Sequence, residues 1–241
     1  MKRPIVYAHR GASGYAIENT IPSFELAITM KADAVEFDVQ LMHDGEVVVF
    51  HDFDLGRLLH IERSVSALTA KDLKKIIFPD TPIPLLSEVL DAIGHKIAMN
   101  IELKSQAEDP VILRELCARV LELVEAHDLR HDVVISSFNR EALRQVRGLS
   151  PAIRMAVLVD DLSNDHAVAS SLKTARDLCA YAVNTSYTSA ATKIVHDLHG
   201  AGLDVNVYTV NNDDLVRQVV RAGVDGLFTN YPDRAIAVLE E

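Results

Sequence analysis

The sequence AVEFDVQLMHDGEVVVFHD, residues 34–52, decides the fold. It opens with an apolar, β-branched run in which Glu36 and Asp38 stand two residues apart. It then passes through the turn dipeptide Asp-Gly and closes with a second apolar run that ends at His51. Two such runs joined by a turn predict a β-hairpin. Because alternate residues of a strand point to the same side, we expect both carboxylates on one face of the first strand.

Apolar runs of this kind alternate with helical patterns along the whole chain. The alternative, a doubly wound sheet, is disfavoured because HRGASGYAIENT after the first run lacks the spacing of a Gly-rich dinucleotide loop. We therefore predict an α/β fold, a (β/α)8 TIM barrel that forms a single domain over residues 1–241. Its strands are expected at residues 4–9, 34–39, 96–103, 132–137, 154–159, 180–184, 203–209 and 224–229.

One segment, roughly residues 43–86, interrupts this alternation. It carries the return strand EVVVFH and the short helix TAKDLKKI, which Thr69 and Asp72 are placed to cap. We interpret the segment as a small insertion after the second strand and not as a separate domain. In the next helix Ser87 is expected at the N-cap, and a later helix is expected to end at Gly148.

The chain is acidic, with a net charge of -11. We therefore expect no nucleic-acid partner and no stable membrane association, and a phosphate-bearing substrate requires local positive charge or a metal. The opening MKRPIVYAHRG lacks the features of a secretory signal, and no run of about 18 apolar residues occurs, so we expect a cytoplasmic protein. Cys117 and Cys179 are expected to be buried, reduced thiols. The sequence does not indicate the oligomeric state.

Polar side chains gather where the predicted strands end. In a barrel of this kind the chemistry lies at the carboxyl ends of the strands. Those ends carry His9 and Arg10, Glu36 and Asp38, His51 and Asp52, Glu102 and Lys104, and Tyr208.

Three of these residues, Glu36, Asp38 and Glu102, are expected to face the barrel interior, because an unpaired carboxylate beneath the outer helices would be costly. Converging carboxylates repel one another unless a cation lies between them, and an all-oxygen site suits Mg²⁺ or Ca²⁺. Interior ion pairs, Glu102 with Lys104 and Glu36 with Arg10, are the competing interpretation.

His9 and His51 would flank this acidic cluster. Since histidine titrates near neutrality, one imidazole can accept a proton while the other donates one, and we predict an acid–base pair. His43 is interpreted as part of the hairpin turn, and the remaining histidines as surface residues.

Four segments together resemble the glycerophosphodiester phosphodiesterase family: residues 8–27, 34–52, 100–104 and 205–212. The resemblance runs from the first strand to the last. It implies a (β/α)8 barrel that uses Mg²⁺ or Ca²⁺ to hydrolyse glycerophosphodiesters, such as glycerophosphocholine or glycerophosphoethanolamine, to sn-glycerol 3-phosphate and an alcohol. It implies these roles: His9 and His51 as the catalytic pair, Glu36, Asp38 and Glu102 as metal ligands, and Arg10 and Lys104 as phosphate-binding cations.

The chain departs from the family pattern at three places. Ile17 stands where a proline usually precedes the Glu-Asn-Thr triplet, and Tyr208 replaces an aromatic that is often tryptophan. LGRLLHIERSV keeps Arg57 of a Leu-x-Arg-Thr-Thr block but not its threonines. Glu18, Tyr208 and Asp52 are expected to support the site or line its pocket, and Asp52 either orients His51 or merely begins the insertion.

Several questions of chemistry stay open at this point. The nucleophile is either water or the glycerol 2-hydroxyl, and we assign His9 as base and His51 as acid. The same site also suits lysophospholipase D-type or phosphoinositide activity. Two further alternatives are a Schiff-base lyase that uses Lys104 and a non-catalytic binder of phosphate esters.

Overall fold

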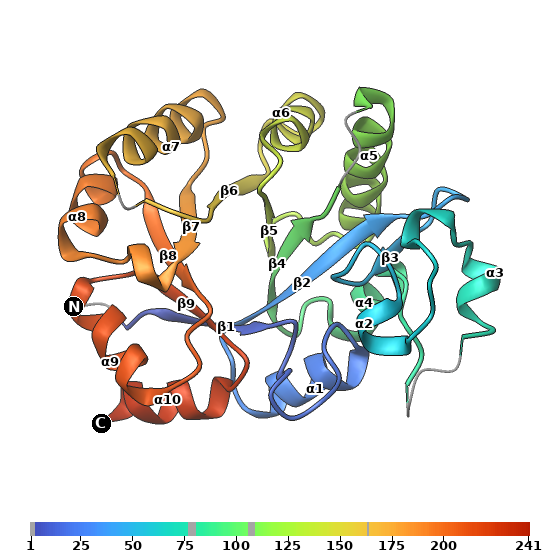
Figure 1. The fold of residues 1–241 in the computed structure, drawn as a ribbon, viewed down its shortest axis with the longest axis horizontal. Helices are drawn as coiled ribbons and strands as arrows, with labels where there is room; N and C mark the ends of the chain where they lie inside the picture. Colours follow the sequence, from blue (N-terminus) through green and yellow to red (C-terminus); the bar gives the residue numbers. More distant parts are fainter. Residues whose placement is uncertain (1–2, 77–80, 106–108, 163) are drawn as a thin grey trace.

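Eight parallel strands close into a barrel with helices around its outside (Figure 1). The computed structural model describes residues 3–76, 81–105, 109–162 and 164–241; residues 77–80 of the predicted insertion lie outside these ranges. Strand β1 pairs with β9 on one side and with β2 on the other, and this pairing closes the sheet. The predicted TIM barrel is confirmed, and the open doubly wound sheet is excluded. The barrel strands are β1 Ile5–His9, β2 Ala34–Leu41, β4 Ala98–Leu103, β5 Val133–Ser137, β6 Arg154–Val159, β7 Ala182–Ser186, β8 Asp204–Tyr208 and β9 Gly226–Thr229.

The helices between the strands form the outer layer (Figure 1). Their starts are set by local capping: the Asn139 and Asn164 side chains, for example, accept hydrogen bonds from main-chain N–H groups of the first turns that follow. The helices of the outer layer are α1 Ile21–Thr29, α4 Leu86–Ile93, α5 Pro110–Ala126, α6 Arg140–Leu149, α7 Asp165–Asp177, α8 Thr192–Gly200, α9 Asp213–Ala222 and α10 Pro232–Glu240, with the short 3₁₀ turn η2 at Tyr187–Ser189.

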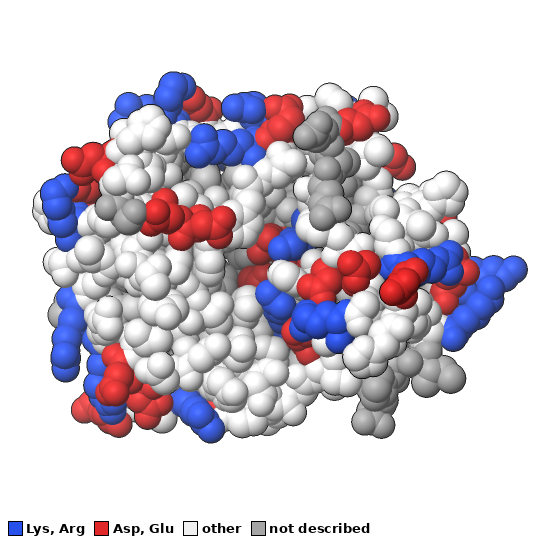
Figure 2. All heavy atoms as spheres, in the orientation of Figure 1, with Lys and Arg blue, Asp and Glu red and all other residues white. Residues whose placement is uncertain are grey.

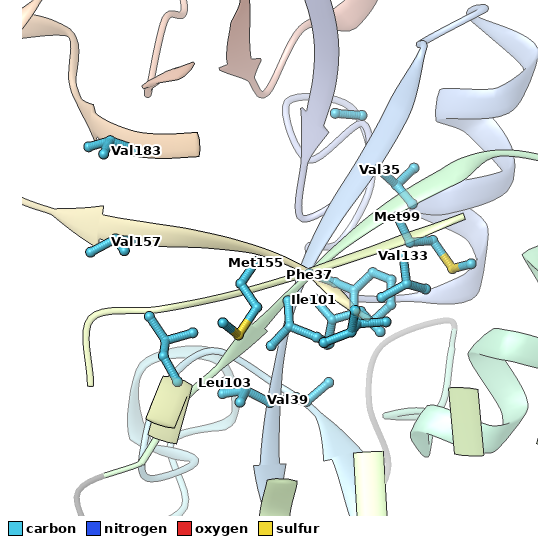
Figure 3. Close-up of a cluster of buried hydrophobic side chains, with 14 of the residues drawn as sticks. Val35, Phe37, Val39, Met99, Ile101, Leu103, Val133, Met155, Val157 and Val183 are labelled. Carbon is cyan, nitrogen blue, oxygen red and sulfur yellow. The ribbon is translucent and has the colours of Figure 1, made fainter. Parts of the chain in front are cut away.

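The main core lies between the barrel wall and these helices. Val35, Phe37 and Val39 of β2 are buried there, together with Met99 and Ile101 of β4 (Figure 3). The alternation of β2 therefore works as predicted, because its odd-numbered residues face the helices and its even-numbered carboxylates face the barrel interior.

The interior of the barrel is polar at mid-height. The side-chain amide of Asn100 donates to the Ser136 hydroxyl at 2.8 Å, and that of Asn206 donates to the Asn184 side-chain oxygen at 2.9 Å. All four residues are buried. Each pair satisfies one donor and one acceptor inside the barrel, while the Asn184 side-chain nitrogen has no hydrogen-bond partner among the described residues.

The insertion extends the barrel wall. Strand β3 (Val47–Val49) pairs antiparallel with the end of β2, which confirms the predicted hairpin. Behind it follow α2 (Gly56–Leu59), η1 (Val65–Ala67) and α3 (Ala70–Leu73), where Thr69 and Asp72 form the expected capping box. A second apolar cluster, which includes Phe50, Leu55 and Leu68, anchors these short elements.

Three local predictions are wrong. Leu85 and not Ser87 is the N-cap of α4, because the Glu88 carboxylate accepts from the Leu85 main-chain N–H at 2.8 Å. Helix α6 continues through Gly148 to Leu149, because Gly148 is not in the left-handed conformation of a helix-ending glycine and the Ser150 main-chain N–H still donates to Val146. Cys117 is buried as expected, but Cys179 is exposed because it lies on a surface turn after α7.

Membrane-spanning helices were also sought in the described part of the chain. None of its helices combines the length and the apolarity that crossing a bilayer requires.

Candidate active site

Most of the predicted site residues line one cavity of about 180 Å³ at the carboxyl ends of the barrel strands, whereas Asp38, Asp52 and Glu18 lie outside its lining. In Figure 2 acidic and basic side chains gather around a hollow near the middle of the visible face. Residues that the sequence analysis selected at separate strand ends therefore lie close together in the fold. Its lining includes His9, Arg10, Glu36, His51, Glu102, Lys104 and Tyr208, and apolar side chains of Phe138, Leu158 and Phe228.

The carboxylates are brought together by strand register. Glu36 lies beside His9 of β1, and Asp38 lies beside Glu102 of β4. One carboxylate oxygen from each of Glu36, Asp38 and Glu102 lies within 4.8 Å of the other two. Neighbouring strands in a closed barrel therefore build a compact three-carboxylate cluster from residues far apart in sequence.

The electrostatics of this cluster fit a divalent cation. Burial, together with repulsion from Asp38 and Glu102, raises the pKa of Glu36 well above its ordinary value. Burial and the charge of Asp38 likewise raise the pKa of Glu102 to about 7, although Lys104 acts in the opposite direction. A cation held between the three groups would remove this penalty, and their all-oxygen donor set suits Mg²⁺ or Ca²⁺.

Two cationic side chains flank the carboxylates. The Lys104 ammonium lies 3.1 Å from Glu102 and 3.7 Å from Asp38, so the predicted Glu102–Lys104 ion pair is present. The Arg10 Nε lies 3.5 Å from Asp38, whereas Glu36 accepts from the Arg10 main-chain N–H at 3.0 Å. Among the described residues the buried Arg10 Nε has no hydrogen-bond partner.

Each histidine is held through its Nδ1 atom. For His9 the partner is the Asn230 side-chain oxygen at 2.8 Å, and the Nε2 atom lies 4.0 Å from the Glu36 carboxylate. Burial, assisted by the positive charge of Arg10, lowers the pKa of His9 to about 4. The imidazole is therefore neutral near pH 7, with Nδ1 carrying the hydrogen.

His51 has a carboxylate partner instead. Its Nδ1 lies 2.7 Å from Asp52 Oδ1, and its Nε2 lies 3.2 Å from the Lys104 ammonium. Partial burial would raise the pKa of Asp52, but hydrogen bonds from Arg57 and His51 lower it below its ordinary value. The contact between Asp52 Oδ1 and His51 Nδ1 is the one that an orienting role for Asp52 requires.

Three site residues were missed by sequence reasoning. Asn230 follows the last strand, Asn19 donates to the Asp38 carboxylate at 2.9 Å, and Gln40 donates to the main-chain carbonyls of Phe50 and Asp52. A signal existed for Gln40, because it continues the i, i+2 series of Glu36 and Asp38 along β2. Asn230 likewise stands directly after a strand end, where polar residues of this fold gather.

An aromatic wall completes the cavity. Tyr208 packs edge-on against Phe138 with ring centroids 6.2 Å apart, and its hydroxyl donates to the Val159 carbonyl at 3.0 Å. Phe138 is 42% exposed, so one side of the mouth is apolar and open to solvent.

The fold and site can be compared with known proteins. The model of the glycerophosphoryl diester phosphodiesterase family matches residues 9–234. A glycerophosphodiester phosphodiesterase of Bacillus altitudinis is 33% identical over 246 residues and covers 98% of both chains. One from Bacillus subtilis (strain 168) is 33% identical over 251 residues, with coverage of 96% of this chain and 85% of that one.

Among solved structures, an Oleispira antarctica phosphodiesterase in complex with the product sn-glycerol-3-phosphate superimposes with a TM-score of 0.89 at 28% identity. The match covers 99% of this chain and 97% of that chain. Together with the closed barrel and its three-carboxylate mouth, these matches place the sequence: the chain belongs to the glycerophosphoryl diester phosphodiesterase family.

Proposed function

We propose that this protein hydrolyses glycerophosphodiesters to sn-glycerol 3-phosphate and an alcohol, with His9 and His51 as the acid–base pair. The observation that carries the proposal is a single small cavity lined by two imidazoles, two cations and two carboxylates, with the third carboxylate, Asp38, grouped with those two. We further propose that residues 1–241 act as one domain, since β3 of the insertion pairs with the barrel strand β2.

The phosphate group would be held by charge. The planar Arg10 guanidinium suits two oxygens of a phosphate, and the Lys104 ammonium adds a compact positive charge beside them. A divalent cation bound by Glu36, Asp38 and Glu102 would polarise a non-bridging phosphate oxygen and offset charge in the transition state. The side chains of Arg10 and Lys104 already lie beside this carboxylate cluster.

The partners of the two histidines support opposite roles. The Asn230 oxygen accepts from His9 Nδ1, so Nε2 offers a lone pair and suits a general base. The Asp52 carboxylate holds the His51 imidazole through Nδ1 and fixes its orientation, and we assign His51 as the general acid. His9 would take a proton from water or from the glycerol 2-hydroxyl, and His51 would protonate the leaving alkoxide.

The direct test is a glycerol 3-phosphate release assay over a panel of glycerophosphodiesters. The protein is first treated with EDTA, and Mg²⁺ or Ca²⁺ is then added back in separate reactions. We expect release only after re-addition. Turnover would exclude a non-catalytic binder, and no release of glycerol 3-phosphate from any diester with either cation would overturn the proposal.

Lysophospholipids are a second candidate substrate class. The exposed Phe138 ring and the apolar wall beside it favour this class, because an acyl chain needs apolar surface at the mouth. The same assay with glycerophosphocholine and lysophosphatidylcholine in parallel decides between the two.

A Schiff-base lyase that uses Lys104 is disfavoured. Burial alone would lower the pKa of this amine, but the Glu102 and Asp38 carboxylates raise it above its ordinary value. A protonated amine is not a nucleophile, so no adduct should be trapped by borohydride. The predicted cytoplasmic location stays a prediction.

A further inference from the structure

Arg57 of helix α2 makes hydrogen bonds to two carboxylates at once. Its Nε donates to Asp52 Oδ2 at 2.5 Å, and its Nη2 donates to Glu18 Oε1 at 2.5 Å. The Nη1 group donates to the other Glu18 oxygen at 3.2 Å. The side chain is 47% exposed and does not line the cavity. Its contacts therefore act on residues of the site and not on a substrate.

Both partners of Arg57 continue into the site. The second oxygen of Asp52 bonds His51 Nδ1 at 2.7 Å, and Glu18 accepts from Arg10 Nη1 at 3.0 Å. A continuous series of charge-assisted hydrogen bonds thus runs from His51 through the insertion to the loop after β1. Such bonds are among the stronger and more directional ones in proteins.

We infer that Arg57 is a positioning residue that holds Asp52, and through it His51, in the geometry of the general acid. The inference rests on the proposed function. With Oδ2 of Asp52 bound to Arg57, Oδ1 is directed at Nδ1, and Nε2 faces the cavity. In the structure His51 Nε2 faces the Lys104 ammonium, so the acid form requires that ammonium to turn to the bound phosphate and Nε2 to carry a proton. As the nucleophile bonds to phosphorus and the bond from phosphorus to the alcohol oxygen breaks, that proton passes to the alcohol oxygen and His51 becomes neutral. Asp52 and Arg57 remain charged throughout.

Binding Asp52 and Glu18 at the same time requires the several N–H groups of an arginine guanidinium. Two separate edges of the guanidinium are in use, one toward Asp52 and one toward Glu18. A single-point cation such as lysine cannot reach both carboxylates in this geometry. Without Arg57, the Asp52 side chain gains rotamers, and the imidazole spends less time in the orientation that delivers its proton.

The test compares Arg57→Gln with Arg63→Gln. Arg63 is a matched control because it is an insertion arginine of similar exposure, 43%, that pairs with Asp72 away from the cavity. We expect Arg57→Gln to lower kcat on glycerophosphocholine about tenfold with KM little changed, part of the hundredfold or more that a general acid supplies. Arg63→Gln should match the wild type.

A substrate with a different leaving group distinguishes the loss of proton delivery by His51 from a non-specific loss of activity. The 4-nitrophenyl ester of glycerol 3-phosphate has a leaving group that departs without a proton, so Arg57→Gln should hydrolyse it at close to the wild-type rate. An equal loss on both esters would overturn the inference. Melting temperatures check folding, and should Arg57→Gln be unfolded, Arg57→Lys in the same pair of assays must show a loss confined to glycerophosphocholine.

A double-mutant cycle tests whether Arg57 affects His51 through Asp52. If Arg57 acts through Asp52, the variant with both Arg57→Gln and Asp52→Asn should be no slower than Asp52→Asn alone. Additive losses would overturn this route. An inactive wild type would overturn the proposed function itself, whereas an active wild type with an undisturbed Arg57→Gln variant would overturn only the role of Arg57.

Discussion

The two histidines differ in the group that holds the Nδ1 atom. His9 is held by a neutral amide oxygen, and His51 is held by a carboxylate that is itself fixed by an arginine. The neutral partner leaves His9 Nε2 with a lone pair, as a general base requires, whereas the carboxylate partner fixes the orientation of the His51 imidazole. The chemistry that we propose for each residue therefore depends on its neighbour and not on the histidine alone.

We expect His9→Ala and His51→Ala each to lower kcat by at least about a hundredfold, because each removes one partner in proton transfer. The measurement is steady-state release of glycerol 3-phosphate. His43→Ala is the matched control, since His43 lies exposed on the hairpin turn. Turnover near the wild-type level in either of the first two variants would contradict their assignment.

Asp38→Asn should weaken divalent-cation binding by at least about tenfold, the effect of even an indirect change at a metal site. Asp38 is 1% exposed, and its carboxylate lies within 4.8 Å of those of Glu36 and Glu102, so its loss removes one of three grouped charges. Titration calorimetry of EDTA-treated protein with Mg²⁺ and with Ca²⁺ measures the change. The exposed Glu25→Gln provides the control, and unaltered affinity in Asp38→Asn would remove Asp38 from the ligand set.

At the scale of elements, the loop between β1 and α1 is shaped by close packing. Arg10 and Gly11 both have positive φ, 56° and 79°, and this turn directs the Arg10 N–H at Glu36. Only glycine fits at the second position, because a Cβ there would lie 2.3 Å from the Ser23 hydroxyl oxygen.

Gly11→Ala should therefore destabilise the protein by more than about 1 kcal/mol, through both strain and steric overlap. Urea unfolding measures the change in the free energy of unfolding. Gly148→Ala is the control, because Gly148 is helical with open space around it, and alanine there should stabilise by about 0.5–1 kcal/mol. Equal shifts in the two variants would show that the loop relaxes around a side chain.

At the scale of the whole molecule, folding concentrates negative charge in the barrel mouth. The chain carries a net charge of -11, and folding buries three of its carboxylates side by side. Arg10 and Lys104 offset part of that charge, and a bound cation would offset more. The stability of the fold should therefore depend on pH and on the cation together.

The sign follows from Glu102, whose pKa is raised from 4.5 to about 7 in the folded protein without a cation. At Glu102 the folded state then binds more protons than the unfolded chain, so this residue makes stability fall as pH rises from about 4.5 to about 7, and the raised pKa of Glu36 acts in the same direction. His9, whose pKa is lowered from 6.5 to about 4, acts in the opposite direction and offsets part of the effect of the two carboxyl groups. We expect the urea midpoint of EDTA-treated protein to fall over this range, and Mg²⁺ or Ca²⁺ to reduce the fall. A midpoint that rises with pH in EDTA would contradict this.

Much of the molecule follows from short-range pattern in the sequence. The strands, the hairpin at the Asp-Gly turn and the interior face of Glu36 and Asp38 are set by the two-residue period, which needs no tertiary information. The positions of the catalytic candidates follow from strand ends in the same way. Predictions that depended on one cap residue, such as Ser87, were wrong where a neighbour satisfied the helix end instead.

Only the tertiary structure decided which side chains at the barrel mouth are hydrogen-bonded to each other. Asn230 meets His9 across 221 positions of sequence, and Lys104 meets His51 across 53. Only closure of the barrel brings such residues within hydrogen-bonding distance, and burial then shifts their pKa values. The sequence by itself thus determined which chemical groups stand at the mouth. The closed fold determined which of them touch, and hence which histidine is suited to give a proton and which to take one.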